Sequence, residues 1–291
     1  MKAADAAART SRFARGRFRA VALDLDGTTL NEVHALSERT LKAIQRVEAA
    51  GVQVILATGR PLRSLQPYVA QLTLQRPVPT VCFNGTCAAL FDPKEAAPQV
   101  LLSRGLTRSA AESIIQMCDD RGWCASYCLP NSTSVCLTTE LQAEWLQKFE
   151  EIEDLRQERV ESLWELLEYE PPLKIVALAE EPFTQAAKAR AMLPPGAAHV
   201  VAAEMHIEFL PADVNKGDTL LRLCNDHLGI RMDEVIAFGD NYNDMEMLTL
   251  AGEGVAMKNA KDELKEAANR VSEWSNDEDA VARELERLLE E

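Results

Sequence analysis

Short, nearly continuous apolar runs alternate along the chain with longer segments in which apolar residues recur at helical spacing. The runs at 18–25, 52–57 and 79–83 are typical of strands that are buried on both faces. Ser37 can cap a helix between the first two runs, and Pro61 suits the first turn of a helix before the third. This βαβαβ order predicts a parallel sheet with helices on both sides.

The pattern changes in the middle of the chain. Residues 86–209 show short strands separated by turns and interspersed with helices, which predicts an antiparallel α+β insert. Beyond Val214, strands and helices alternate again. We therefore expect an α/β protein whose parallel-sheet core, residues 18–85 and 210–291, is interrupted by an α+β domain at 86–209.

Composition excludes several classes of protein. The chain has 291 residues, of which 47% are hydrophobic and 26% charged, the usual balance for a soluble globular protein of about two domains. No apolar run approaches the roughly 20 residues of a membrane span. The net charge of −15 argues against binding to a nucleic-acid polymer, which needs a basic face to replace counterions. It does not exclude a small anionic substrate, because the field inside a cleft can oppose the global charge.

The N-terminus and the cysteines bear on the compartment. The first 20 residues contain one acid, Asp5, against the basic residues Lys2, Arg9, Arg12, Arg15, Arg17 and Arg19. We interpret residues 1–17 as a disordered leader, with an organelle-targeting peptide as the alternative. The seven cysteines include no CxxC pair, which favours small core residues in a reducing compartment over a zinc site. We expect a cytoplasmic monomer or homodimer, unless the leader directs the protein to an organelle.

Two acidic residues follow the first predicted strand directly, in the run DLDGT. Asp24 and Asp26 are two positions apart at a strand end and are expected to share a face. One carboxylate can attack a phosphorus atom while the other handles protons. Gly27 lets the backbone approach an anion, and its N–H group can hold a phosphate oxygen. The alternative interpretation is a turn with solvated acids, which fits this compact motif less well.

Two shorter motifs offer ligands for phosphate. ATGR places Thr58, Gly59 and Arg60 at a predicted helix start, where a hydroxyl, backbone N–H groups and a guanidinium can hold an anion. NKG places Lys216 at another helix start, where the helix dipole disfavours a cation by a few tenths of a kcal/mol. That position suggests that the ammonium faces an anion. Taken alone, each motif fits an ordinary helix cap or a solvated lysine better than a phosphate site.

A fourth motif, GDNYND, follows the predicted strand at 235–238. Its oxygen-bearing side chains, Asp240, Asn243 and Asp244, suit Mg²⁺, although they could simply cap the next helix. An EF-hand is excluded because the 12-residue ligand spacing with its terminal Glu is absent. In an open parallel sheet the loops at the carboxyl ends of the strands converge on one crevice, so all four motifs can share a site.

The ordered set DLDGT, ATGR, NKG and GDNYND resembles the haloacid dehalogenase (HAD) superfamily, whose members are mostly phosphatases. The uninterrupted GDNYND and the long insert are similar to its Cof-type branch. This resemblance covers about residues 18–291 and implies a Rossmann-like core with a large α/β cap that closes over the site.

The resemblance also implies residue roles. Asp24 is the nucleophile that forms an aspartyl-phosphate, and Asp26 protonates the leaving oxygen and then activates the hydrolytic water. The phosphate-binding residues it implies are Gly27, Thr58, Gly59 and Lys216. The Mg²⁺ ligands it implies are Asp24, the backbone carbonyl of Asp26, and Asp240, with Asn243 and Asp244 supporting them. The residues it places on the substrate side are Arg60, Asn84 and Gly85.

Three functions follow from these observations. The first is a Mg²⁺-dependent phosphatase for a small phosphorylated metabolite, such as a sugar phosphate, a nucleotide or a phosphorylated cofactor. The second is a phosphosugar mutase, which uses the same aspartate but returns the phosphoryl group to its substrate. The third is a non-catalytic, receiver-like phosphate-binding module. Asp26 argues against the third, since an acid/base at this position promotes turnover rather than a long-lived phosphoryl group.

Overall fold

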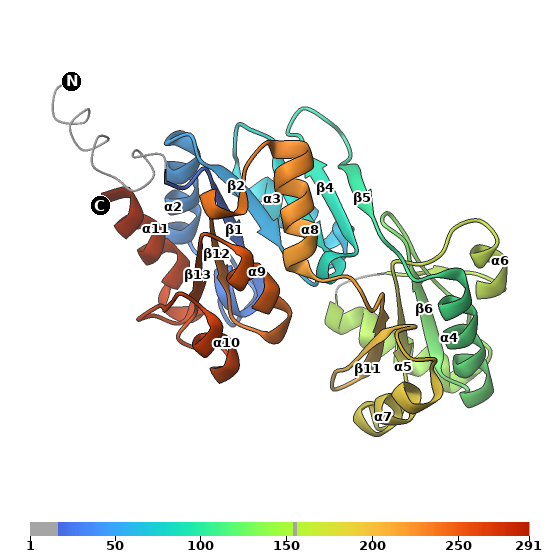
Figure 1. Cartoon of the computed structure of the whole chain (residues 1–291). Helices are drawn as coiled ribbons and strands as arrows, with labels where there is room; N and C mark the ends of the chain where they lie inside the picture. The colour runs from blue at the N-terminus through green and yellow to red at the C-terminus, as the bar shows by residue number, and fades with distance from the viewer. Residues whose placement is uncertain (1–16, 154–155, 291) are drawn as a thin grey trace. The chain divides into compact units, whose positions relative to one another are not determined.

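The computed structural model describes residues 17–153 and 156–290. The predicted leader therefore lies outside the described residues, apart from Arg17. Two compact units are present: one combines Met1–Leu102 with Asn215–Glu291, and the other is Ser103–Val214. In Figure 1 the first unit contains both the blue N-terminal and the orange-red C-terminal elements. The second unit thus interrupts the first in the sequence.

The first unit is built on an eight-stranded sheet with the strand order β14-β13-β12-β1-β2-β3-β4-β5. Its strands are β1 (Ala20–Leu23), β2 (Gln53–Ala57), β3 (Val78–Cys82), β4 (Cys87–Phe91), β5 (Gln99–Ser103), β12 (Val235–Gly239), β13 (Glu253–Ala256) and β14 (Arg270–Val271). The six strands from β14 to β3 are mutually parallel, and in the central register Val21 pairs with Ile236 and Val54. The predicted α/β class with a Rossmann-like parallel sheet is confirmed.

Every residue of β1 and β12 is buried, as expected of strands in a parallel sheet that is covered by helices on both faces. Helix α2 packs against α3 and α11, while α8 packs against α9. The helices of this unit are α2 (Glu38–Ala49), α3 (Gln66–Leu72), α8 (Lys216–Arg222), α9 (Met245–Leu250), α10 (Asp262–Ala267) and α11 (Ala280–Glu290). Shorter helical turns are η1 (Leu25–Thr29), η2 (Leu62–Leu65), η3 (Phe83–Gly85), η4 (Leu223–Leu228), η5 (Met232–Glu234), η6 (Tyr242–Asp244) and η7 (Asn276–Glu278). Ser37 caps α2 as predicted, its side chain accepting from the Thr40 N–H.

The division between the units differs from the one drawn on the sequence. The pattern placed the insert at 86–209, whereas the second unit is Ser103–Val214. Strands β4 and β5 belong to the core sheet, because β4 forms an antiparallel hairpin with β3 in which Thr80 pairs with Ala89. An antiparallel edge on a parallel sheet gives the same short-strand pattern as an antiparallel insert.

The second unit has a six-stranded sheet in the order β10-β11-β9-β6-β7-β8, antiparallel except for the β7–β8 pair. Its strands are β6 (Cys124–Cys128), β7 (Thr133–Val135), β8 (Glu158–Arg159), β9 (Lys174–Leu178), β10 (His199–Ala202) and β11 (His206–Leu210). Its helices are α4 (Arg108–Arg121), α5 (Glu140–Glu153), α6 (Leu163–Leu167) and α7 (Pro182–Met192). Alternate strand residues such as Tyr127, Ile175 and Phe209 share one apolar core with α4 and α7.

The cysteines and the lengths of the helices bear on two expectations from the sequence. All seven cysteines are free, and six of them are buried. Within residues 17–153 and 156–290, no helix is long and apolar enough to cross a membrane.

Candidate active site

Asp24 lies immediately beyond β1, and only 4% of it is exposed. The Nζ atom of Lys216 donates to Asp24 Oδ1 at 2.7 Å and to Asp244 Oδ1 at 2.8 Å. Lys216 is the first residue of α8 and is itself 1% exposed. The helix start that disfavours a cation therefore places this ammonium between two carboxylates.

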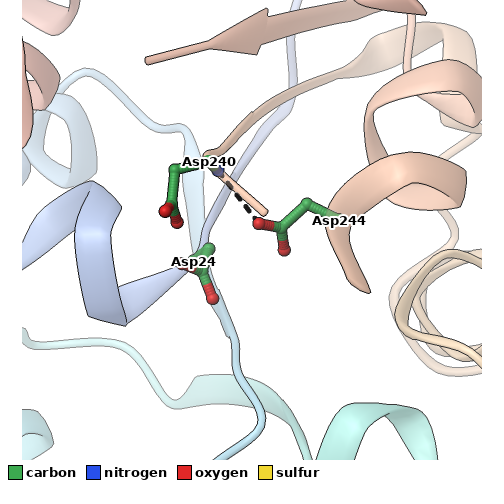
Figure 2. A group of neighbouring side chains, drawn as sticks. All are labelled: Asp24, Asp240 and Asp244. Carbon is green, nitrogen blue, oxygen red and sulfur yellow. Dashed lines mark hydrogen bonds between the residues drawn. The ribbon is translucent and has the colours of Figure 1, made fainter. Parts of the chain in front are cut away.

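Three carboxylates gather at this point. Asp24, Asp240 and Asp244 each offer one oxygen, and these oxygens lie within 4.8 Å of one another (Figure 2). Asp244 Oδ2 accepts from the backbone N–H groups of Asp240 and Asn241 at 3.0 and 3.1 Å, and its Oδ1 accepts from Lys216. Both oxygens of Asp244 are thus engaged in holding the loop and the lysine. The carboxylates of Asp24 and Asp240 are better placed to take a metal ion.

The charges of this cluster do not balance. Burial, followed by the charge of Asp244, raises the pKa of Asp240 from 3.8 to about 6 and raises that of Asp24 well above its ordinary value. Burial alone would lower the pKa of Lys216, but Asp24 and Asp244 outweigh it and raise that pKa. One ammonium therefore faces three carboxylates. Hard oxygen ligands with excess negative charge are the donor set that Mg²⁺ prefers, so the residues fit this ion.

Two glycines allow the loops around the cluster to approach closely. Gly27 has a φ of +76°, and a Cβ there would lie 2.4 Å from Asp240 Oδ2. Gly85 has a φ of +102°, and a Cβ there would lie 2.2 Å from the carbonyl oxygen of Asn215. Any larger residue would push apart the loops that carry Asp240 and Lys216.

The ATGR turn lies beside the loop after β3. Thr58 is 1% exposed, and its Oγ1 accepts from the backbone N–H of Arg60 at 3.1 Å. A Cβ on Gly59 would lie 2.9 Å from Asn84 Oδ1, which also accepts from Asn243 Nδ2 at 2.8 Å. We expected Asn243 to support the metal ligands, but its side chain contacts Asn84, which we expected on the substrate side. The buried Oδ1 of Asn243 has no hydrogen-bond partner among the described residues.

Asp26 has quite different surroundings. Arg60 Nε and Nη2 donate to its two oxygens at 2.7 and 2.6 Å, and His34 Nδ1 lies 3.0 Å from Oδ1. Burial would raise the pKa of Asp26, but Arg60 and then His34 outweigh it and lower that pKa. We expected the two aspartates to share a face, yet they contact different partners. The strand ends at Leu23, so its alternation does not extend to Asp26.

Two residues of this second cluster, His34 and Tyr68, were not among the site residues expected from the sequence. The His34 side chain is 66% exposed and contacts Asp26. The Arg60 guanidinium lies 5.1 Å from the centre of the Tyr68 ring, and the Tyr68 hydroxyl donates to the His34 carbonyl at 3.3 Å. The sequence offered one weak signal, the short distance between His34 and the first motif. Tyr68 lies within a helical pattern and gave none.

A comparison with known families decides the assignment. A family model described as haloacid dehalogenase-like hydrolase matches residues 21–285. The chain belongs to this family. The hydrolase is 32% identical over 289 residues to the 5-amino-6-(5-phospho-D-ribitylamino)uracil phosphatase YitU of Bacillus subtilis, covering 92% of this chain and 97% of the relative. It is 30% identical over 287 residues to an HMP-PP phosphatase of Serratia proteamaculans, covering 94% and 96%.

Solved structures share the fold. A crystal structure from Thermotoga maritima matches with a TM-score of 0.80 at 24% identity, covering 93% of this hydrolase and 97% of that chain. A haloacid dehalogenase-like hydrolase from Bacteroides thetaiotaomicron matches with a TM-score of 0.78 at 24% identity, covering 93% and 99%. The resemblance to Cof-type HAD enzymes is confirmed, and so is the prediction of a phosphomonoester hydrolase.

Proposed function

We propose that this hydrolase is a Mg²⁺-dependent phosphatase that releases phosphate from a small phosphorylated metabolite through an aspartyl-phosphate on Asp24. The observation that carries the proposal is the buried Asp24, held by Lys216 beside Asp240 and Asp244. The named substrates of the relatives point to the same class of compound: a phosphoribityl-aminouracil, HMP-PP and, for an Escherichia coli relative, pyridoxal phosphate.

The residues that would hold Mg²⁺ are the carboxylates of Asp24 and Asp240 and the backbone carbonyl of Asp26. Asp244 would orient them, since it fixes both Lys216 and the Asp240 backbone. When bound, Mg²⁺ offsets the negative charge with which a phosphoryl group repels an attacking carboxylate.

The chain's own residues would then divide hydrolysis into two steps. Asp24 attacks phosphorus, the bond between phosphorus and the ester oxygen breaks, and Asp26 gives that oxygen its proton. Asp26 next takes a proton from a water molecule that attacks the aspartyl-phosphate, which releases phosphate and restores Asp24. Thr58 and Lys216, with the backbone N–H groups of Gly27 and Gly59, hold the phosphoryl oxygens through both steps.

We assign Ser103–Val214 the role of the cap that the family resemblance implies. Asn84 and Gly85 keep their proposed place on the substrate side, beside the phosphate-binding turn. Asn243 supports Asn84 in this proposal rather than the metal, because its amide donates to Asn84.

Phosphate release from a panel of phosphorylated metabolites, with and without Mg²⁺, tests this proposal. We expect Mg²⁺-dependent release that Asp24→Asn abolishes. Asp233→Asn is the matched control, because Asp233 is an exposed aspartate of the same unit that pairs with Arg231. Rearranged sugar phosphate without free phosphate would favour the mutase, and a stable phosphoprotein would favour the receiver-like module.

A further inference from the structure

We propose that His34, Arg60 and Tyr68 form a subsite for the leaving group. The subsite selects phosphate esters that carry oxygen acceptors on the carbons next to the ester oxygen, as polyol and sugar phosphates do. The inference rests on the proposed function, because it takes Asp26 as the proton donor to the leaving oxygen.

The position of Asp26 locates the subsite. A general acid must lie within hydrogen-bond reach of the oxygen that it protonates. The first carbons of the leaving group must therefore lie against the groups around the Asp26 carboxylate. Those groups are the Arg60 guanidinium at 2.6 and 2.7 Å and the His34 imidazole at 3.0 Å.

The loop before α2 is shaped to present His34. Asn31 Oδ1 accepts from the backbone N–H groups of Val33 and Ala35 at 3.2 and 2.9 Å, and the Asn31 carbonyl accepts from the His34 N–H at 2.9 Å. This turn holds His34 at a φ of +55°. A non-glycine residue in that region is strained, and such strain concentrates at functional sites. Here it occurs at the residue whose side chain reaches Asp26.

The chemistry of the cluster favours acceptor oxygens over hydrocarbon. The guanidinium of Arg60 is held in one plane by its two bonds to Asp26 and by the Tyr68 ring beneath it. His34 adds an imidazole that is 66% exposed beside this plane. A hydroxyl oxygen of a polyol can accept from the exposed imidazole of His34, whereas an alkyl chain offers this donor no acceptor.

Two esters with the same three-carbon skeleton test this selection. Glycerol 3-phosphate carries hydroxyls on the two carbons beyond the ester carbon, and n-propyl phosphate carries none. We expect kcat/KM of the native enzyme to favour the glycerol ester by about tenfold, the effect of one or two hydrogen bonds. His34→Ala should reduce this preference to about twofold.

Two further variants isolate the imidazole. His34→Asn replaces it with a shorter side chain that tolerates positive φ, so the loop keeps its shape while the preference falls. His227→Ala is the matched control, because His227 is an exposed histidine on η4 of the same unit. It should retain the full tenfold preference.

The outcomes separate this inference from the proposed function. Release from both esters without a preference, or a preference that survives His34→Ala, overturns the subsite and leaves the phosphatase standing. An equal loss on both esters in His34→Ala also overturns the subsite, because His34 would then act only through Asp26. No release from any ester with Mg²⁺ present contradicts the phosphatase itself.

Discussion

Asp24 and Asp26 are two residues apart in the sequence and occupy opposite environments. Asp24 is buried, faces Lys216 and shares its surroundings with two further carboxylates. Asp26 has a side chain that is 41% exposed and is enclosed by Arg60 and His34. The pKa of Asp24 is raised by burial and by Asp244, whereas the pKa of Asp26 is lowered by its cationic partners.

This difference fits the two chemical roles that we propose for the motif. A buried carboxylate beside an ammonium and a cluster of metal ligands suits attack on phosphorus, because its negative charge is offset there. A partly exposed carboxylate such as that of Asp26 can contact both a leaving group and a water molecule. The low pKa that Arg60 and His34 give Asp26 keeps it ionised, which is the form that its proposed second role, the activation of water, requires. Environment, rather than residue type, separates the roles.

The largest expected effect comes from removing the cation of the buried cluster. Lys216→Met leaves three buried or half-buried carboxylates facing one another, so we expect it to lower the free energy of unfolding by about 3 kcal/mol without metal. Saturating Mg²⁺ should recover part of this loss. Urea unfolding with and without Mg²⁺ measures both quantities. Lys258→Met, at an exposed pair with Glu278, should cost less than about 1 kcal/mol; an equal loss in the two variants would contradict the account.

A smaller effect is expected from Asp244→Asn. The amide cannot accept from Lys216 and from two backbone N–H groups as the carboxylate does, so it would hold Asp24 and Asp240 less firmly. We expect Mg²⁺ affinity to fall by about 10- to 100-fold, as for other residues that orient metal ligands. A Mg²⁺ titration of phosphate release measures the change. Undiminished affinity would show that Asp244 does not orient the metal ligands.

Asp240, in the buried carboxylate cluster, and Asp26 should also differ in the sign of their contribution to the pH dependence of stability. The folded-state pKa of Asp240 is raised from 3.8 to about 6, so its contribution to stability without metal is full below about 4 and is lost as the pH rises through about 6. The pKa of Asp26 is lowered, so its contribution is present above 3.8 and is lost as the pH falls through its folded value. Urea unfolding of Asp240→Asn and Asp26→Asn against the native protein, from about pH 2 to 8, should show these opposite slopes: the Asp26 slope below pH 3.8 and the Asp240 slope between about 4 and 6. Parallel slopes would remove the distinction.

The smallest effect is expected at the second cluster, in which Arg60 and His34 contact Asp26. Arg60→Lys replaces two guanidinium bonds to Asp26 with one point charge, so we expect KM to rise about fivefold with a smaller change in kcat. Steady-state kinetics on a sugar phosphate measure this split. Arg46→Lys, on the exposed surface of α2, is the control and should leave KM unchanged. A loss confined to kcat would assign Arg60 to the chemical step instead of to substrate binding.

Much of the fold could be predicted because its signals are local. Continuous apolar runs such as 52–57 identified the parallel strands, and Ser37 marked the start of α2 through its cap. Strands β4 and β5 were placed in the insert, because an antiparallel edge strand and an inserted strand have the same pattern. The position of β4 in the core sheet depends on its antiparallel pairing with β3, and the local sequence pattern does not show which strand it pairs with.

The site shows the same limit. The four motifs predicted that residues far apart in the sequence meet, and the contact between Lys216 and Asp24, 192 residues apart, agrees with this expectation. The sequence could not predict that Asn243 contacts Asn84, or that His34 contacts Asp26, because both depend on loop conformation. His34 adopts a positive φ that its residue type disfavours, so propensity argued against the observed turn.

The most direct test of the division of roles is to trap the phosphorylated residue. Asp26→Asn removes the base for the second step, so p-nitrophenyl phosphate, whose leaving group needs no acid, should phosphorylate the variant and leave the intermediate in place. Acid quenching followed by borohydride reduction converts an aspartyl-phosphate to homoserine, which peptide mass spectrometry locates. The account predicts homoserine at position 24 only, and none when Asp24→Asn is added to the variant. Homoserine at another aspartate, or phosphate release without any trapped residue, would contradict it.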